Sequence, residues 1–121
     1  MRRVIIVVVA FLSGVFGLDV GQAVETKLTV SNPGYFGRSV SVSGTRMLVG
    51  DDSADGHGAA YIFEHDGVSW TQTAKLTASD AASYDAFGCS VSLDGNRAVI
   101  GAMYDDDAAS NSGSAYVFEY N

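Results

Sequence analysis

Residues 36–50 read FGRSVSVSGTRMLVG, and residues 87–101 read FGCSVSLDGNRAVIG. The two stretches begin 51 positions apart and are identical at eight of their fifteen positions. Most of the remaining positions exchange one apolar residue for another. A fixed period of about 20 to 50 residues is typical of proteins built from stacked repeats. The repeat therefore limits the fold before any single element is assigned.

The first copy predicts four successive strands. Residues 36–42 alternate apolar and polar side chains, as a strand with one apolar face does. Residues 47–49 form an apolar run that is typical of a strand covered on both faces. Residues 58–64 predict a third strand, and the Asp-Gly pair at 66–67 is a hairpin signal. Residues 70–78 then predict the fourth strand.

The second copy repeats this order but lacks the fourth strand. Residues 87–93, 98–102 and 113–119 match the first three strands of the first copy. A counterpart of the fourth strand precedes the first copy instead, because residues 26–30 (TKLTV) resemble residues 74–78 (AKLTA). We therefore expect residues 26–30 to be a displaced fourth strand.

These patterns predict an all-β fold of two four-stranded antiparallel β-propeller blades, which is a partial propeller. Repeat one covers about residues 36–78 and repeat two about residues 87–121, within a module at residues 24–121. Two blades are too few to curl round and bring residues 26–30 to the last strand of the same chain. We therefore expect this strand to pair with residues 114–119 of another copy.

The Phe-Gly pair that opens each copy, together with the glycine that ends the apolar run, resembles the FG-GAP repeat. This family is known from the propeller of integrin α chains and from many secreted bacterial proteins. The matching positions are Phe36-Gly37 with Gly50, and Phe87-Gly88 with Gly101-Ala102. The resemblance implies a β-propeller in an extracytoplasmic setting.

Integrin-like copies of this repeat carry a calcium loop of the form DxDxDGxxD between the FG and GAP motifs. Here that space holds only the short turns at residues 43–46 and 93–97. The chain therefore resembles a short bacterial-type form, and the family's calcium site does not carry over to this position.

Residues 1–23 have the layout of a secretory signal peptide. Two arginines are followed by fifteen residues without a charge, at positions 4–18, and by Gly-Gln-Ala at positions 21–23. Fifteen apolar residues are fewer than the roughly 20 that a spanning helix needs. We expect cleavage before Val24, no membrane span after cleavage, and a secreted or extracytoplasmic location in the periplasm, on the cell surface or outside the cell.

Charge and cysteine content exclude several classes of partner. Residues 24–121 hold 5 Lys or Arg and 13 Asp or Glu, so their net charge is 5 − 13 = −8. Nucleic acids and anionic membranes require a basic surface, so neither is an expected partner. The single cysteine cannot form a disulfide within the chain.

One loop begins like a calcium site. Asp51, Ser53 and Asp55 occupy ligand positions 1, 3 and 5, and Gly56 occupies the turn position of such a loop. Positions 9 and 12 are Ala and Ile, which offer no side-chain oxygen. We favour a solvated loop shaped by Asp and Gly over this weak metal site, and we expect no cofactor. The corresponding aspartates at residues 105–107 predict loose cation binding at most.

Other chemistry-bearing side chains favour structural roles. His57 and His65 have no cysteine or second carboxylate at the spacing of a zinc site. Cys89 lies on the apolar phase of its strand and is expected to act as a small buried hydrophobe. Arg38 either faces a central channel and pairs with an acid, or snorkels at the edge of its strand. For Trp70, Tyr61 and Tyr116 we favour packing between blades over a sugar-binding platform.

No nucleophile–base set, phosphate-binding loop or carboxylate pair stands out in the sequence. We therefore expect a non-catalytic binding, adhesion or scaffold module. The alternatives are a fragment or subunit of a propeller-type extracytoplasmic enzyme, and a truncated propeller gene. Expected partners are other copies or other propeller blades, with an extracellular protein or glycan as a further class of ligand. Fold alone does not identify that ligand.

Overall fold

The computed structural model describes residues 3–6 and 24–121, which belong to two compact units, Met1–Ser31 and Asn32–Asn121. In the first unit, β1 (Arg3–Ile6) pairs antiparallel with β2 (Val24–Lys27). The predicted signal peptide lies outside the described residues except for β1, so its cleavage stays a prediction. No helix among the described residues combines the length and the apolar character needed to cross a membrane.

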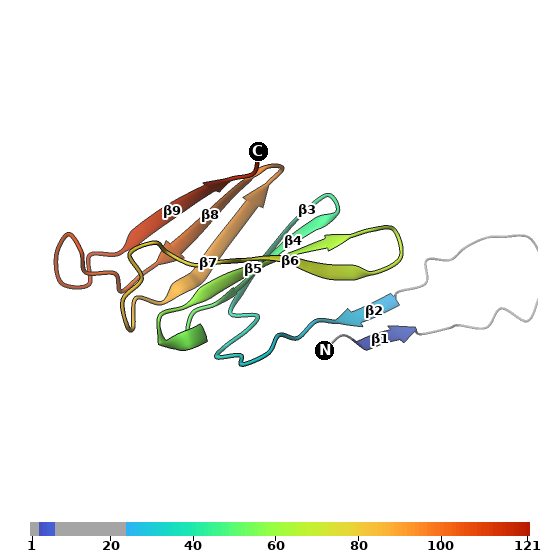
Figure 1. Ribbon diagram of the computed structural model, residues 1–121, viewed down its shortest axis with the longest axis horizontal. Helices are drawn as coiled ribbons and strands as arrows, with labels where there is room; N and C mark the ends of the chain where they lie inside the picture. The colour runs from blue at the N-terminus through green and yellow to red at the C-terminus, as the bar shows by residue number, and fades with distance from the viewer. Residues whose placement is uncertain (1–2, 7–23) are drawn as a thin grey trace, which may run out of the picture. The chain divides into compact units, whose positions relative to one another are not determined.

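The first sheet of the second unit is a four-stranded antiparallel blade, which we call blade 1 (Figure 1). Its strands follow one another in chain order and are joined by short turns, as the sequence predicted. They are β3 (Ser39–Ser43), β4 (Arg46–Asp51), β5 (Ala59–His65) and β6 (Trp70–Leu76). At the β5–β6 hairpin, the Asp66 carboxylate accepts hydrogen bonds from the backbone N–H groups of Val68 and Ser69, both at 2.8 Å.

The second sheet of this unit, blade 2, contains the three strands β7 (Phe87–Asp94), β8 (Arg97–Ala102) and β9 (Ser114–Glu119). They also follow chain order and match the predicted strands. Among the residues that the structure describes, no strand pairs with the outer edge of β9. The strand expected as the fourth of this blade begins within β2, which pairs with β1 instead.

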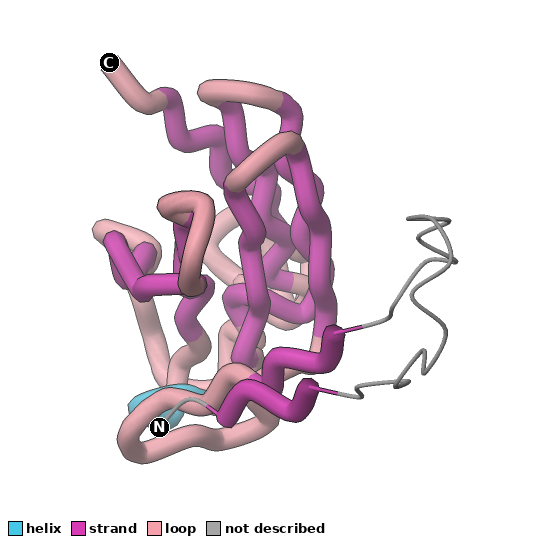
Figure 2. Tube along the Cα trace, turned by 90° about the vertical axis from the view of Figure 1, so that its right-hand side faces the viewer, coloured by secondary structure: helices cyan, strands magenta, loops and turns pink. Residues whose placement is uncertain are grey.

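The loop from β4 to β5 contains the short 3₁₀ helix η1 (Ala54–Gly56), drawn in cyan in Figure 2. The first strand of blade 1 begins at Ser39, which is later than the Phe36 start that alternation predicted. Pairing with β4 starts only at Ser39 opposite Gly50, whereas in blade 2 Phe87 already pairs with Ala102 and a bulge follows before Ser90.

An apolar core lies between the two blades. Leu48 from β4 and Phe87 and Ile100 from blade 2 are its largest fully buried apolar side chains. The rest of the buried cluster is Ala60, Ala78, Leu93, Ala98 and Ala102. Because these side chains come from both sheets, each blade is stabilised by the face of its neighbour.

The strand β3 turns its serine face, and not its valine face, toward blade 2. Val40 and Val42 are exposed to solvent. Three hydrogen bonds tie the serines to blade 2: Ser39 Oγ donates to Gly88 O (2.7 Å), Leu93 N–H donates to Ser41 Oγ (3.0 Å), and Gly95 N–H donates to Ser43 Oγ (3.0 Å). The predicted alternation is confirmed, but the apolar face of this strand points away from the core between the blades.

Candidate functional site

The buried carboxylate of Asp51, at the end of β4, is held by backbone donors. It accepts hydrogen bonds from the N–H groups of Gly34 (2.8 Å), Tyr35 (2.7 Å) and Ser53 (3.3 Å). These bonds fix the loop that precedes β3 against the end of β4. The Asp51 carboxylate is therefore occupied by hydrogen bonds from the backbone of its own blade.

The other two predicted calcium ligands point elsewhere. Ser53 Oγ donates to the carboxylate of its neighbour Asp52 at 3.5 Å, and Asp55 pairs with Lys75 of β6. Two groups of three close carboxylates occur among the described residues, and neither contains Asp51 or Asp55. The structure thus gives each of the three residues its own contacts, and the preference for a solvated loop over a weak calcium site stays a prediction.

The side chains of Asp55, Lys75 and Tyr61 form a connected group on blade 1. Lys75 Nζ lies 2.5 Å from the Asp55 carboxylate and 5.7 Å from the centre of the Tyr61 ring. The hydrogen bond and charge of Lys75 lower the pKa of Asp55, and the same hydrogen bond raises the pKa of Lys75. The sheet register sets this arrangement, because Lys75 of β6 pairs directly with Tyr61 of β5.

The corresponding place in blade 2 holds a tyrosine and several carboxylates. Tyr116 occupies the position of Tyr61 in the repeated strand sequence. Its hydroxyl oxygen lies 2.8 Å from carboxylate oxygens of both Asp80 and Asp105. We use the name acidic cluster for Asp80, Asp85, Asp105, Asp106 and Asp107, whose carboxylates form the two close groups. No ion pair found among the described residues involves this cluster.

Protonation in the acidic cluster is uneven. Hydrogen bonds from the Asp107 N–H and from the Tyr116 hydroxyl lower the pKa of Asp105. The hydrogen bond between Asp107 and Asp80 and the negative charge of Asp105 raise the pKa of Asp107. Burial, followed by the hydrogen bonds to Asp105 and Asp80, raises the pKa of Tyr116. An added positive charge would relieve this concentration of negative charge.

The sequence indicated only part of this cluster. The three aspartates at residues 105–107 are consecutive and were recognised as a cation-attracting loop. Asp80 and Asp85 were missed, because they lie about 20 to 25 positions earlier in the chain. The available signal was their place in the repeat, since Asp80 follows the fourth strand of blade 1 and Asp85 precedes the second Phe-Gly pair.

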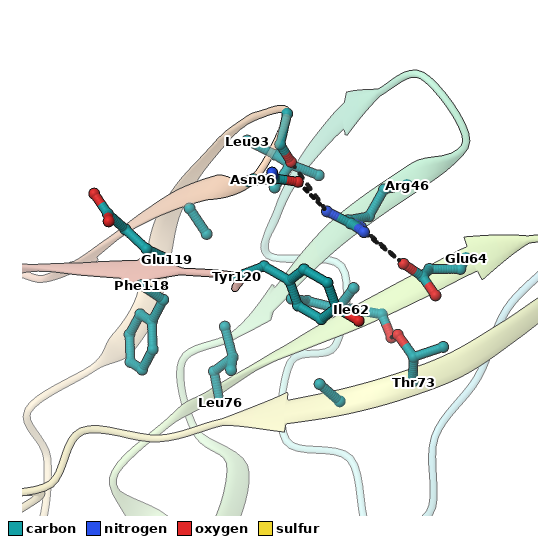
Figure 3. A pocket seen from close by; sticks show the side chains of 13 residues that line it. Arg46, Ile62, Glu64, Thr73, Leu76, Leu93, Asn96, Phe118, Glu119 and Tyr120 are labelled. Atoms are coloured by element: carbon teal, nitrogen blue, oxygen red, sulfur yellow. Dashed lines mark hydrogen bonds and ion pairs between the residues drawn. The ribbon is translucent and has the colours of Figure 1, made fainter.

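A pocket of about 250 Å³ lies between the two blades, next to β6 and β9 (Figure 3). Its apolar wall includes Leu76 and Phe118, and Arg46 spans its rim. Arg46 donates to the Glu64 carboxylate at 2.9 Å and to Gly95 O at 3.1 Å, which connects the rims of both blades. The pocket is therefore part of the contact between the blades.

The remaining predicted residues have structural contacts. Arg38 pairs with Asp52 at 3.3 Å, and its side chain is more than half exposed. It therefore has an acidic partner and also faces solvent. Cys89 is half-buried, and its thiol donates to Gly101 O at 3.4 Å. The aromatic contacts are edge-to-face, with ring centres at 5.6 Å for Phe36–Tyr61, 5.3 Å for Phe87–Tyr116 and 5.0 Å for His65–Trp70.

The two histidines also bond locally. His57 Nδ1 lies 3.0 Å from Gly58 O, and His65 Nδ1 accepts the Gly67 N–H at 3.1 Å. Both contacts are within two residues along the chain, so they belong to the turns in which the histidines lie.

The chain matches the FG-GAP repeat over residues 24–63 and again over residues 70–118. Comparison with curated proteins found no match. The first matched segment runs from the start of β2 into β5, and the second runs from the start of β6 into β9. β2 and β6 therefore open the two matched segments. On this evidence the chain belongs to the FG-GAP repeat family and contains two of its repeats.

Proposed function

We propose that this FG-GAP repeat protein is an exported, non-catalytic scaffold or adhesion module that acts by joining its blades to those of other copies. The observation that supports the proposal is the outer edge of β9, with which no described strand pairs. An open strand edge presents backbone N–H and C=O groups that readily pair with another chain.

Residues 26–30 of a second copy are the segment suited to this edge. In blade 1, the equivalent strand β6 covers β5, with Leu76 opposite Ala60 and Lys75 opposite Tyr61. The same register on β9 places Leu28 opposite Ala115 and Lys27 opposite Tyr116. Each copy would then receive its fourth strand for blade 2 from a neighbour.

Charge complementarity favours this register. In blade 1, Lys75 pairs with Asp55 beside Tyr61. In blade 2, Tyr116 contacts Asp80 and Asp105 of the acidic cluster. A neighbour's Lys27 opposite Tyr116 would supply the positive charge that this cluster lacks among the described residues.

Export fits the same scheme. β1 lies within the segment that we expect to be removed, and it is the strand that pairs with β2 in the described residues. Cleavage before Val24 would remove this pairing and leave the edge of β2 open for β9 of another copy. Three or four chains would contribute six or eight blades, within the usual range of about four to eight for a propeller.

The test compares the exported protein with a variant that lacks residues 24–31 and with Lys27→Glu and Lys27→Arg. Sedimentation velocity should find assembled wild type and a folded but unassembled deletion variant. Lys27→Glu should weaken assembly by roughly tenfold or more, because it places a carboxylate against the acidic cluster, while Lys27→Arg should retain it. Assembly of the deletion variant at wild-type concentrations would contradict the proposal.

A further inference from the structure

We propose that copies of this chain dock head to tail, by repeating between chains the contact that blade 1 makes with blade 2 within the chain. This inference rests on the proposed function and names the two surfaces through which copies meet. The head face is the side of blade 1 that carries Val40 and Val42. The tail face is the side of blade 2 that carries Ser90, Ser92, Asp94, Val99 and Val117.

The contact within the chain shows what such a surface requires. Blade 1 presents a serine row, made of Ser39, Ser41 and Ser43, to the backbone of β7. Beside this row, Leu48 is fully buried and Ile62 packs against the core between the blades. The contact therefore combines three polar anchors with an apolar patch.

The tail face repeats the same residue types and is exposed. Ser90, Ser92 and Asp94 of β7 stand where blade 1 has its serine row, and all three are exposed. Val99 takes the place of Leu48 and is 39% exposed, whereas Leu48 is 0% exposed. Val117 takes the place of Ile62 and is 59% exposed. Blade 2 thus carries a copy of the surface that blade 1 uses for docking, without a blade packed on it.

The head face carries the complementary surface. Val42 is 63% exposed, whereas its counterpart in blade 2, Leu93, is 8% exposed beneath blade 1, and the neighbouring Val40 is 65% exposed. On the same face Val49, Tyr61 and Phe63 are already buried, with Phe36 packed on the two rings, so the open part of the head face is its edge along β3. The backbone groups that the serine row binds in blade 2 recur in blade 1 as Gly37 O, Val42 N–H and Gly44 N–H. Docking would then pair these groups with Ser90, Ser92 and Asp94 of a second copy.

This contact is heterologous, because it joins two different faces of the same chain. Heterologous contacts form closed rings when the rotation between copies closes, and open filaments when it does not. The occupant of each face is a second copy of this chain, because one chain carries both halves of the contact.

Two glycines offer a matched pair of substitutions. A Cβ at Gly50 would lie 2.0 Å from Gly88 O, which is backbone of the facing blade. A Cβ at the equivalent Gly101 would meet Ser90 Oγ at 2.3 Å, the end of a side chain that can rotate. Gly101→Ala should therefore leave the two-blade unit folded and clash with Gly37 O of a docked copy.

The experiment mixes two blocked variants of the exported full-length chain. Gly101→Ala blocks the tail face, and Val42→Asp blocks the head face. Each alone should assemble roughly 10- to 100-fold more weakly than wild type, as expected for an overpacked or charged contact. A 1:1 mixture should form a heterodimer through the one intact pair of faces, seen by native mass spectrometry as one copy of each variant.

The inference would be overturned if either variant alone assembled as strongly as wild type, or if the mixture stayed monomeric. Val40→Asp serves as a second head-face variant if Val42→Asp does not fold, as judged by circular dichroism. The two proposals fail separately. A monomeric wild type contradicts the proposed function, whereas an assembling wild type with equally assembling face variants contradicts only the head-to-tail contact.

Discussion

Lys75 Nζ lies 2.5 Å from the Asp55 carboxylate and also faces the Tyr61 ring. The ion pair joins β6 to the loop between β4 and β5. The repeat places Lys27 in the equivalent position of the displaced strand. The blade 1 contact therefore describes both a stabilising interaction within the chain and the expected interaction between copies.

The Asp55–Lys75 pair should make stability depend on acid. Lys75 lowers the pKa of Asp55 from 3.8, so the carboxylate's contribution is present above pH 3.8 and is lost as the pH falls through the lower folded value. The effect should be small, because the pair is solvent-exposed. Urea unfolding from about pH 6 to pH 2 should show a smaller acid-induced loss in Lys75→Met than in wild type. An unchanged acid dependence in Lys75→Met would contradict the assignment, and Lys75→Arg is the control.

Asp107 should change the pH dependence of stability in the direction opposite to Asp55. Its pKa is raised from 3.8 by the hydrogen bond to Asp80 and by the charge of Asp105, so its ionisation disfavours the fold as the pH rises above 3.8. In the unassembled chain, Asp107→Asn should therefore raise the free energy of unfolding relative to wild type, and the increase should be larger at neutral pH than at pH 4. Equal unfolding midpoints for wild type and Asp107→Asn at both pH values would refute this expectation.

Asp51 should be needed for stability whether or not calcium is present. Asp51→Ala leaves the N–H groups of Gly34 and Tyr35 without their acceptor, which should cost about 2–4 kcal/mol of unfolding free energy. Asp52→Ala, which loses a surface ion pair with Arg38, should cost less than about 1 kcal/mol. Thermal melts with and without millimolar calcium check both points. A large calcium-dependent rise in melting temperature that disappears in Asp51→Ala would establish a metal site instead.

Gly50 should be intolerant of a side chain. A Cβ added at this position would overlap the backbone of Gly88 in blade 2. Gly50→Ala should therefore lower the free energy of unfolding by about 1–3 kcal/mol or more, because it forces the blades apart. Gly101→Ala should lose much less in the unassembled chain. Chemical denaturation of both variants measures the difference, and equal losses would argue against close contact at Gly50.

The strand order was predictable because each strand is short, alternates or is uniformly apolar, and is bounded by turn residues. The inward face of β3 was not predictable from alternation. The Ser-Val pattern tells only that the two faces of the strand differ, and the serines face inward because backbone groups of β7 lie opposite them. Such a choice depends on a strand about 50 residues away in the chain.

The candidate site was predictable only where its residues are close in sequence. Asp51, Ser53 and Asp55 follow a loop pattern, yet their oxygens are taken by separate contacts with backbone groups, Asp52 and Lys75. The acidic cluster combines the connection between β6 and β7 with the loop between β8 and β9, and no local pattern links Asp80 to Asp105. Tyr116, which bonds to both, connects them only after β9 is paired with β8.

The most direct test of the account is the mass of the native exported particle, measured by native mass spectrometry and sedimentation equilibrium. We expect a discrete particle of three or four processed chains, with six or eight blades. A well-folded, protease-resistant monomer over the same range of concentrations would contradict it.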